Sequence, residues 1–211
     1  MSTDNLIELL VADGSSCRSF QARFRSMAAC AVTFVALAFF LEVGLRHDFS
    51  QAIRSGWFLY KVFAMLALAV ISTGATRCAG NPHGDIGRWM PAYAGVLISL
   101  AGAVALKLLI TPQSEWFTQL VGHDAWRCMT LIPLLSIGPL ACLLLALRQG
   151  APARPSLAGA LAGLGASSIA ATFYAANCTD DSPLFVLTWF SVPMILLAAT
   201  GYLFGRRLLD W

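Results

Sequence analysis

Six long apolar stretches dominate the sequence and leave the chain very few folds. A bilayer core about 30 Å thick is crossed by roughly 20 residues of α-helix, and hydrocarbon tolerates no unpaired backbone polar group. Uniformly apolar segments of this length are too long for the strands of a membrane barrel. We therefore predict an all-α polytopic membrane protein with six transmembrane helices. The predicted spans are residues 27–45, 57–76, 90–111, 128–147, 157–177 and 184–205.

The composition argues against a soluble protein and against a nucleic-acid binder. Only 12% of the residues are charged and 58% are hydrophobic, whereas a soluble domain has about 25% charged residues. The net charge of +3 is small, and no basic run with interleaved aromatic residues lies outside the apolar stretches, so we expect no direct contact with DNA or RNA. The residues before the first span do not resemble a signal peptide, so this span is expected to remain as a membrane anchor.

The distribution of basic residues predicts the orientation. Cytoplasmic loops of membrane proteins carry an excess of Lys and Arg. The loops on the side of the two termini hold nine arginines and those on the opposite side hold three, so both termini are predicted to lie in the cytoplasm. The nine are Arg18, Arg23, Arg25, Arg77, Arg88, Arg148, Arg154, Arg206 and Arg207, and the three are Arg46, Arg54 and Arg127.

The N-terminal segment, residues 1–26, is predicted to be a cytoplasmic unit ahead of the membrane domain 27–211. Residues 4–13 have the pattern of a short amphipathic helix that Asp4 caps and Gly14 ends. A helix this short folds only against something else. Its acidic polar face favours a groove on a protein partner over the anionic membrane surface, and a docked or disordered tail is the alternative. The residues predicted to bind the partner are Asp4, Leu6, Ile7, Leu9 and Leu10.

Three ionisable residues, Glu42, Lys61 and Lys107, fall inside predicted spans. Such groups are costly in a membrane and point to function by default. The predicted topology puts each of them about one helical turn below the outer surface. They form either an ion-paired cluster or three separate side chains that reach to the interface, and the sequence favours neither.

Two of the six cysteines, Cys128 and Cys178, lie at the outer ends of the fourth and fifth spans. Consecutive antiparallel helices are usually neighbours, so these thiols are expected to be close. In an oxidising compartment they would form a disulfide or serve as a thiol sensor, and two unrelated cysteines are the alternative. No spacing typical of a zinc site is present, so we predict neither a permanent metal site nor a cofactor.

Gly159 and Gly163 are four residues apart in the fifth span, and Ser167 and Ala171 continue the pattern. Small residues at this spacing let membrane helices approach closely. We therefore expect the fifth span to pack tightly against another helix.

Several short motifs, spread over essentially the whole chain, resemble a known family. They are residues 3–10, 57–61, 147–155, 178–183 and 206–208, together with Cys128. With them the chain resembles the NrsF-type integral membrane anti-sigma factors, negative regulators of an extracytoplasmic-function sigma factor. The family pattern often has His and Pro around the second cysteine. Asn177 and Thr179 stand there instead, which argues against a metal role for that turn.

The resemblance implies a function. The N-terminal segment would hold an extracytoplasmic-function sigma factor at the bacterial inner membrane until stress releases it. The family's two functional cysteines would be Cys128 and Cys178. We predict a non-enzymatic anti-sigma factor whose periplasm-facing thiols sense a heavy metal or a redox change.

Two rival functions are a membrane thiol oxidoreductase and a small transporter. The oxidoreductase needs a reactive dithiol, usually Cys-x-x-Cys, and the sequence has no such motif. Transporter sites lie near the bilayer midplane, whereas the three intramembrane charges are predicted near one surface. Both rivals therefore fit the sequence less well.

Overall fold

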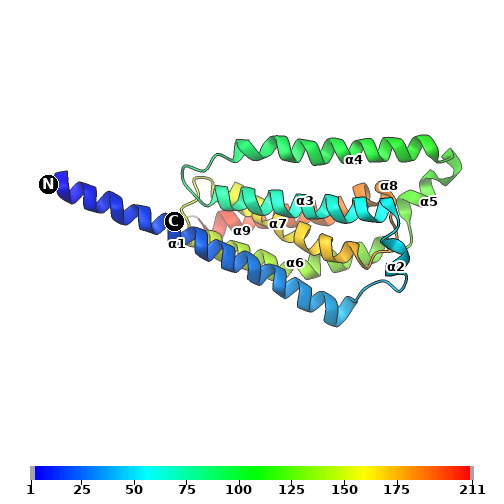
Figure 1. The fold of residues 1–211 in the computed structure, drawn as a ribbon, viewed down its shortest axis with the longest axis horizontal. Helices are drawn as coiled ribbons and strands as arrows, with labels where there is room; N and C mark the ends of the chain where they lie inside the picture. Colours follow the sequence, from blue (N-terminus) through cyan, green and yellow to red (C-terminus); the bar gives the residue numbers. More distant parts are fainter. Residues whose placement is uncertain (1–2, 210–211) are drawn as a thin grey trace.

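The computed structural model describes the backbone of residues 3–209 and the side chains of residues 20–209. Within this range the chain forms helices and no strand, and six helical segments are long and apolar enough to cross a membrane (Figure 1). The predicted fold class, an all-α membrane protein with six spans, is confirmed, while its orientation stays a prediction. The six segments are Phe20–Val43, Gly56–Ala79, Ile86–Ile110, Gln113–Arg148, Pro155–Ala175 and Pro183–Leu208.

Each span contains one long α-helix, and short turns lead into or out of it. The long helices are α1 (Thr3–Ala38), α3 (Gly56–Ala79), α4 (Met90–Ile110), α6 (Ala125–Arg148), α7 (Pro155–Ala175) and α9 (Ser191–Leu208). The short helices are α2 (Phe49–Ala52), α5 (Trp116–Val121) and α8 (Pro183–Phe185). The remaining turns are the π-helical Phe39–Val43 and Val186–Phe190 and the 3-10 turns Ile86–Trp89 and Gln113–Glu115.

The prediction of a separate N-terminal helix that ends at Gly14 is wrong, because α1 runs unbroken from Thr3 to Ala38. A glycine inside a helix costs only about 1 kcal/mol relative to alanine, so Gly14 by itself does not end the helix. The 36 residues of α1 give a length of about 54 Å at 1.5 Å per residue, well beyond a bilayer core. The side chains predicted to bind a partner, from Asp4 to Leu10, lie outside the described side chains, and the division at residue 26 stays a prediction.

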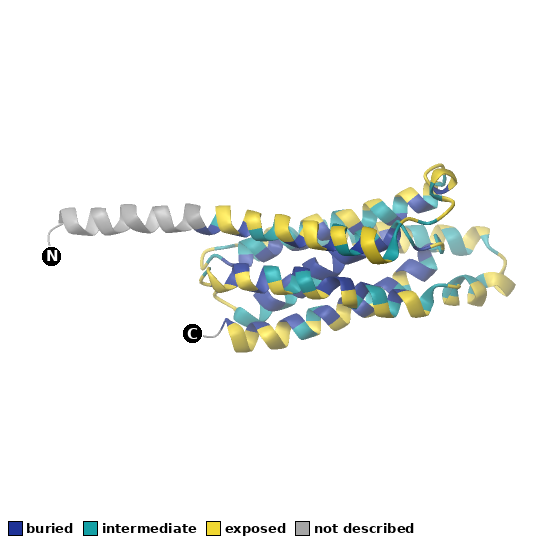
Figure 2. Cartoon of the chain, turned by 90° about the horizontal axis from the view of Figure 1, so that it is seen from below, coloured by how far each residue is buried: buried dark blue, intermediate teal, exposed yellow. Residues whose placement is uncertain are grey.

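Helix α7 lies at the centre of the bundle and contacts α3, α6 and α9. Most of its residues are small and buried. Helix α1 packs mainly on α6, whereas α4 lies along one edge (Figure 1). Exposed residues line the outer sides of the helices and buried ones the sides that face each other (Figure 2). Because large apolar side chains such as Leu109 and Ile98 of α4 are among the exposed ones, this outer surface suits contact with lipid tails.

The close approach of α7 and α9 depends on glycines on both helices. A Cβ at Gly163 would collide with the backbone carbonyl of Leu197, and a Cβ at Gly159 would collide with the carbonyl of Gly201. On the α9 side, a Cβ at Gly205 would lie 2.6 Å from the carbonyl oxygen of Pro155 of α7. Without a hydrophobic effect between helices in lipid, such close backbone packing is a main source of association. The expected tight contact of the fifth span is therefore present, with α9 as the partner.

The two ends of the bundle differ in chemistry. At one end α3, α6 and α9 finish with arginines in their last turns, namely Arg77, Arg148 and the pair Arg206 and Arg207. We call this the arginine end. The opposite end carries Cys128 and Cys178 and the loop between α7 and α8, and we call it the thiol end.

Candidate functional site

The structure brings the two predicted sensor cysteines together. Cys128 lies in the first turn of α6 and Cys178 just beyond the end of α7. Both are 0% exposed and belong to the same buried cluster as Tyr174 and Phe185. Both thiols are free in this structure. The two cysteines, 50 positions apart in the sequence, thus form one buried pair.

The surroundings of Cys178 make its thiol more acidic than that of an ordinary cysteine. The neighbouring thiol of Cys128 lowers the pKa of Cys178, and the positive charge of Lys61 acts in the same direction, against the effect of burial. The Tyr174 hydroxyl is buried beside the pair and makes no hydrogen bond of good geometry within residues 20–209. A buried hydroxyl without a partner costs about 1–3 kcal/mol. This hydroxyl could therefore form a hydrogen bond with a chemically modified sulfur of the pair.

Residues 177–182, which we call the thiol turn, lie over the two sulfurs. Lys61, a residue of α3, binds this turn through hydrogen bonds. The Lys61 side chain is 1% exposed. Its Nζ donates to the Asp181 carboxylate at 2.6 Å, to the carbonyl oxygen of Cys178 at 2.9 Å and to that of Asp180 at 3.1 Å. All three donors of the ammonium are therefore used inside one turn. A buried charge is tolerated only when it is paired and hydrogen-bonded in this way.

Arg46, in the loop after the first span, is the second cation of the site. Its guanidinium donates to the other oxygen of Asp181 at 3.1 Å and to two oxygens of Asp48 at 2.6 Å each. The hydrogen bonds between Arg46 and Asp48 lower the pKa of the exposed Asp48 carboxyl to about 2. The Phe58 ring lies within 5.7 Å of both cationic groups, Arg46 and Lys61. Asp181 is thus the shared counter-ion of two cations, Arg46 in the loop after the first span and Lys61 on α3.

Two aspartates tie the thiol turn to the start of α6. The Asp180 carboxylate accepts the backbone N–H groups of His123 at 2.8 Å and Asp124 at 2.9 Å. In return, the Asp124 carboxylate accepts the backbone N–H of Thr179 at 3.2 Å and its hydroxyl at 2.7 Å. A carboxylate at the N-terminus of a helix is also favoured by the helix dipole.

Gly122 allows the loop before α6 to reach this arrangement. Its φ is +58°, a conformation that residues with a Cβ rarely adopt. A Cβ there would also lie 2.6 Å from the Asp180 carboxylate and 2.5 Å from the Phe185 ring. Both the backbone angle and the space therefore require glycine.

The thiol turn also reaches the end of the first span. The side-chain amide of Asn177 donates to the carbonyl oxygens of Gly44 at 3.0 Å and Val43 at 3.4 Å. The turn is therefore hydrogen-bonded to the segment that follows α1, to α3 through Lys61 and to the start of α6 through Asp124.

Of the two alternatives for Glu42, Lys61 and Lys107, the ion-paired cluster is wrong, because these residues make no ion pair with one another within residues 20–209. Lys61 pairs with Asp181, since the loop after α7 folds over the end of the bundle and brings its own carboxylate. The Lys107 ammonium lies over the Trp57 ring at 5.7 Å. Glu42 is exposed on the π-helical turn at the end of the first span.

Sequence reasoning missed Arg46 and gave Asp181 no role beyond the family motif. The available signal for Arg46 was an arginine close to an acidic residue, Asp48, on the predicted outer side. Nothing in the sequence links either residue to Lys61, because the loops that bring them together are far apart along the chain.

A polar pocket of about 280 Å³ lies outside the thiol turn. Its lining includes Lys107, His123, Thr179 and Asp180, and neither thiol lines it. A reagent that enters from this end therefore meets the turn before it meets the sulfurs. Within residues 20–209 no group of three or more His, Cys, Asp or Glu side chains has the arrangement of a metal site.

The fold and the site together define a polytopic helical membrane protein with a buried thiol pair at one end of its bundle. The chain belongs to the NrsF family, described as negative regulator of sigma F, whose model matches residues 10–211. This membership confirms the resemblance found in the sequence.

Two relatives match over the full length of both chains. A probable anti-sigma-F factor NrsF of Azospira oryzae is 32% identical over 217 residues, and the anti-sigma-F factor NrsF of Caulobacter vibrioides is 31% identical over 215 residues. No solved structure matches the chain.

Proposed function

We propose that this protein is a membrane anti-sigma factor that holds an extracytoplasmic-function sigma factor at the cytoplasmic face of a bacterial inner membrane. Stress that reaches Cys128 and Cys178 from the periplasm, a heavy-metal ion or an oxidant, releases the sigma factor. The full-length similarity to two proteins named anti-sigma-F factors supports this regulatory role most directly. It favours the role over a thiol oxidoreductase or a small transporter.

The buried thiol pair supports the sensing step. An oxidant that accepts two electrons converts the two thiols into a disulfide and releases two protons. A thiophilic divalent cation bound by both sulfurs also releases two protons. Because both cysteines are 0% exposed, either reaction needs the thiol turn to move. The lowered pKa of Cys178 makes its thiolate the first nucleophile or ligand.

Helix α1 is the proposed mechanical link between the two ends of the protein. The segment after it accepts hydrogen bonds from Asn177 of the thiol turn. The helix itself runs without a break back to Thr3, through the residues predicted to bind the partner. A shift of the thiol turn thus acts on one end of the helix that carries the sigma-binding segment at its other end. A change of a few kcal/mol between two states suffices for such coupling.

The apolar face of residues 4–13 is expected to bind the sigma factor. The combined variant Leu6→Ala, Leu9→Ala and Leu10→Ala should weaken co-purification with the sigma factor about tenfold or more, because apolar anchors at helical spacing carry most of the energy in a groove. The matched control is Leu37→Ala with Leu41→Ala on the exposed face of the same span, which should bind normally. Undiminished binding by the triple variant, at normal membrane levels, would remove this segment from the interface.

The thiol pair is expected to be required for release but not for binding. In cells with a sigma-dependent reporter, Cys128→Ser and Cys178→Ser should each keep the reporter silent when Cd²⁺ or diamide is added. The control is Cys30→Ser with Cys142→Ser, a second pair of neighbouring cysteines inside the spans α1 and α6, which should respond like the wild type. A normal response of both single variants would contradict the sensing role.

A further inference from the structure

An apolar groove between α1, α3 and α7, which we call the α1/α3 groove, has a basic mouth at the arginine end. Its volume is about 540 Å³, within the range of ordinary ligand sites. The wall is apolar and includes Val32, Leu66, Val70 and Ile169. Arg25, Arg77 and Trp89 line the groove near its mouth, and the two arginines supply its charge. The hydroxyls of Thr73 and Thr172, which also line it, donate to carbonyl oxygens of their own helices. The groove thus combines a long apolar wall with positive charge at one end.

The two arginines at this mouth have no counter-ion among the side chains that the structure describes. Arg25 is exposed and Arg77 is half-buried, and neither forms an ion pair with a carboxylate within residues 20–209. This contrasts with the thiol end, where Lys61 and Arg46 both pair with Asp181. The free positive charge favours an anionic group from outside the protein.

Trp89 adds a donor that lacks an acceptor. Its Nε1 is buried and has no hydrogen-bond partner within residues 20–209. Its ring packs so closely on α3 that a Cβ at Gly74 would overlap it, so the ring is held in place. A buried donor without an acceptor costs about 1–3 kcal/mol. Because no atom from outside reaches Nε1 in this structure, the contribution of Trp89 to the groove is its fixed ring, which is typical of a membrane–water interface.

We propose that the α1/α3 groove binds one anionic phospholipid of the adjoining leaflet. An acyl chain lies along the apolar wall, and the phosphate lies between Arg25 and Arg77. Basic pockets between transmembrane helices are known to bind anionic headgroups in this manner. The site is independent of the proposed sigma-factor binding and of the orientation in the membrane.

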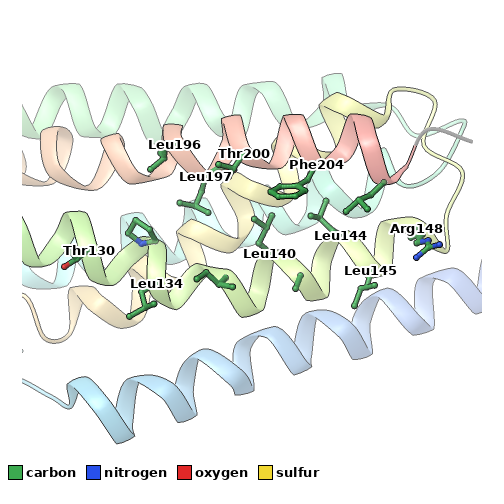
Figure 3. Close-up of a pocket in the computed structure, with 14 residues that line it drawn as sticks. Thr130, Leu134, Leu140, Leu144, Leu145, Arg148, Leu196, Leu197, Thr200 and Phe204 are labelled. Atoms are coloured by element: carbon green, nitrogen blue, oxygen red, sulfur yellow. The ribbon is translucent and has the colours of Figure 1, made fainter.

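The larger groove of the bundle lacks this combination. It lies between α6 and α9, has a volume of about 800 Å³ and is lined by apolar side chains such as Leu134, Leu140 and Phe204 (Figure 3). Arg148 is its only basic residue, at the arginine end, and no unpartnered buried donor lines it within the described residues. General contact with lipid tails suffices there, so the proposal is limited to the α1/α3 groove.

The test is native mass spectrometry of the purified full-length protein with phosphatidylglycerol or phosphatidylcholine of the same acyl chains. The wild type should retain phosphatidylglycerol about thirtyfold more strongly, as expected for two arginines near a lipid headgroup. Arg25→Gln with Arg77→Gln should lose this preference. The matched control Arg206→Gln with Arg207→Gln removes the same charge from the same end outside the groove and should keep it. Equal binding of the two lipids, or an equal loss in the control, would overturn the proposal.

A second pair of variants tests the groove itself without changing charge. Val70 is 62% exposed and lines the groove, so Val70→Trp should fill it and abolish the preference while the fold persists. Val192→Trp, on an exposed position of α9, should bind as the wild type does. Glycerol phosphate, which has the headgroup without the chains, should not displace the lipid. Full binding by Val70→Trp, or displacement by glycerol phosphate, would show that the groove is not the site.

Discussion

Asp181→Asn is expected to lower the free energy of unfolding by about 3–5 kcal/mol, the usual cost of removing one partner of a buried ion pair. Lys61 is 1% exposed, and its ammonium would have no carboxylate to balance it. Arg46 would lose the same counter-ion. Thermal unfolding of the purified protein in detergent, followed by circular dichroism, measures the change.

The matched control for this prediction is Asp48→Asn. It makes the same chemical change on the same cation, Arg46, but Asp48 is exposed, and exposed ion pairs contribute little. Its unfolding temperature should stay close to that of the wild type. The double variant Lys61→Met with Asp181→Asn should recover much of the lost stability, because it leaves no unpaired ammonium. Equal stability of Asp181→Asn and the wild type would show that the pair does not hold the thiol turn.

The same substitution should also open the site. With Asp181 neutral, the thiol turn loses its ion pairs with Lys61 and Arg46 and keeps only neutral hydrogen-bond acceptors for Lys61, so the buried thiols become easier to reach. Labelling of Cys128 and Cys178 by a maleimide should therefore be faster in Asp181→Asn than in the wild type.

Gly163→Val is expected to cost more than about 3 kcal/mol, above the usual range for added volume in a packed interior. The reason is that its Cβ would collide with backbone atoms of α9, and backbone atoms, unlike a flexible side chain, have no other place to go. The two helices would have to separate along their whole contact. The yield of monodisperse protein and its unfolding temperature in detergent are the measurements.

The control is Gly95→Val on α4, where an added Cβ meets no atom within 4 Å. This variant should fold and unfold like the wild type. If Gly163→Val gives no folded protein, Gly163→Ala provides a milder form of the same test, with a clear loss of stability expected. A Gly163→Val protein as stable as Gly95→Val would mean that the α7–α9 contact contributes little to the bundle.

The membrane-spanning architecture was predictable because it depends on local properties of the chain. The length and hydropathy of each stretch decide whether it crosses a bilayer. The second predicted span, 57–76, falls within the helix Gly56–Ala79, and the fifth, 157–177, nearly coincides with Pro155–Ala175. Lys61 was predictable as a candidate functional residue for a similar reason, since a charge inside an apolar span is costly wherever the span packs.

The position of each span in the bundle was not predictable in the same way. Helices α4 and α7 both qualify as spans, yet α7 is the centre and α4 lies at the edge. Hydropathy measures compatibility with lipid, and the inside of a membrane protein is about as apolar as the lipid around it. Only the spacing of Gly159 and Gly163 indicated that α7 packs closely, and it did not identify α9 as the partner.

For the thiol end, the sequence by itself placed Cys128 and Cys178 at the ends of consecutive spans and marked Lys61 as a costly charge, whose partner it left open. The tertiary structure alone decided that this partner is Asp181 rather than Glu42. It also decided that Arg46 shares Asp181 and that both thiols are buried beneath the turn. The physical reason is that hydropathy and helical periodicity are properties of adjacent residues. An ion pair between positions 61 and 181, by contrast, depends on how separate loops fold over the end of the bundle.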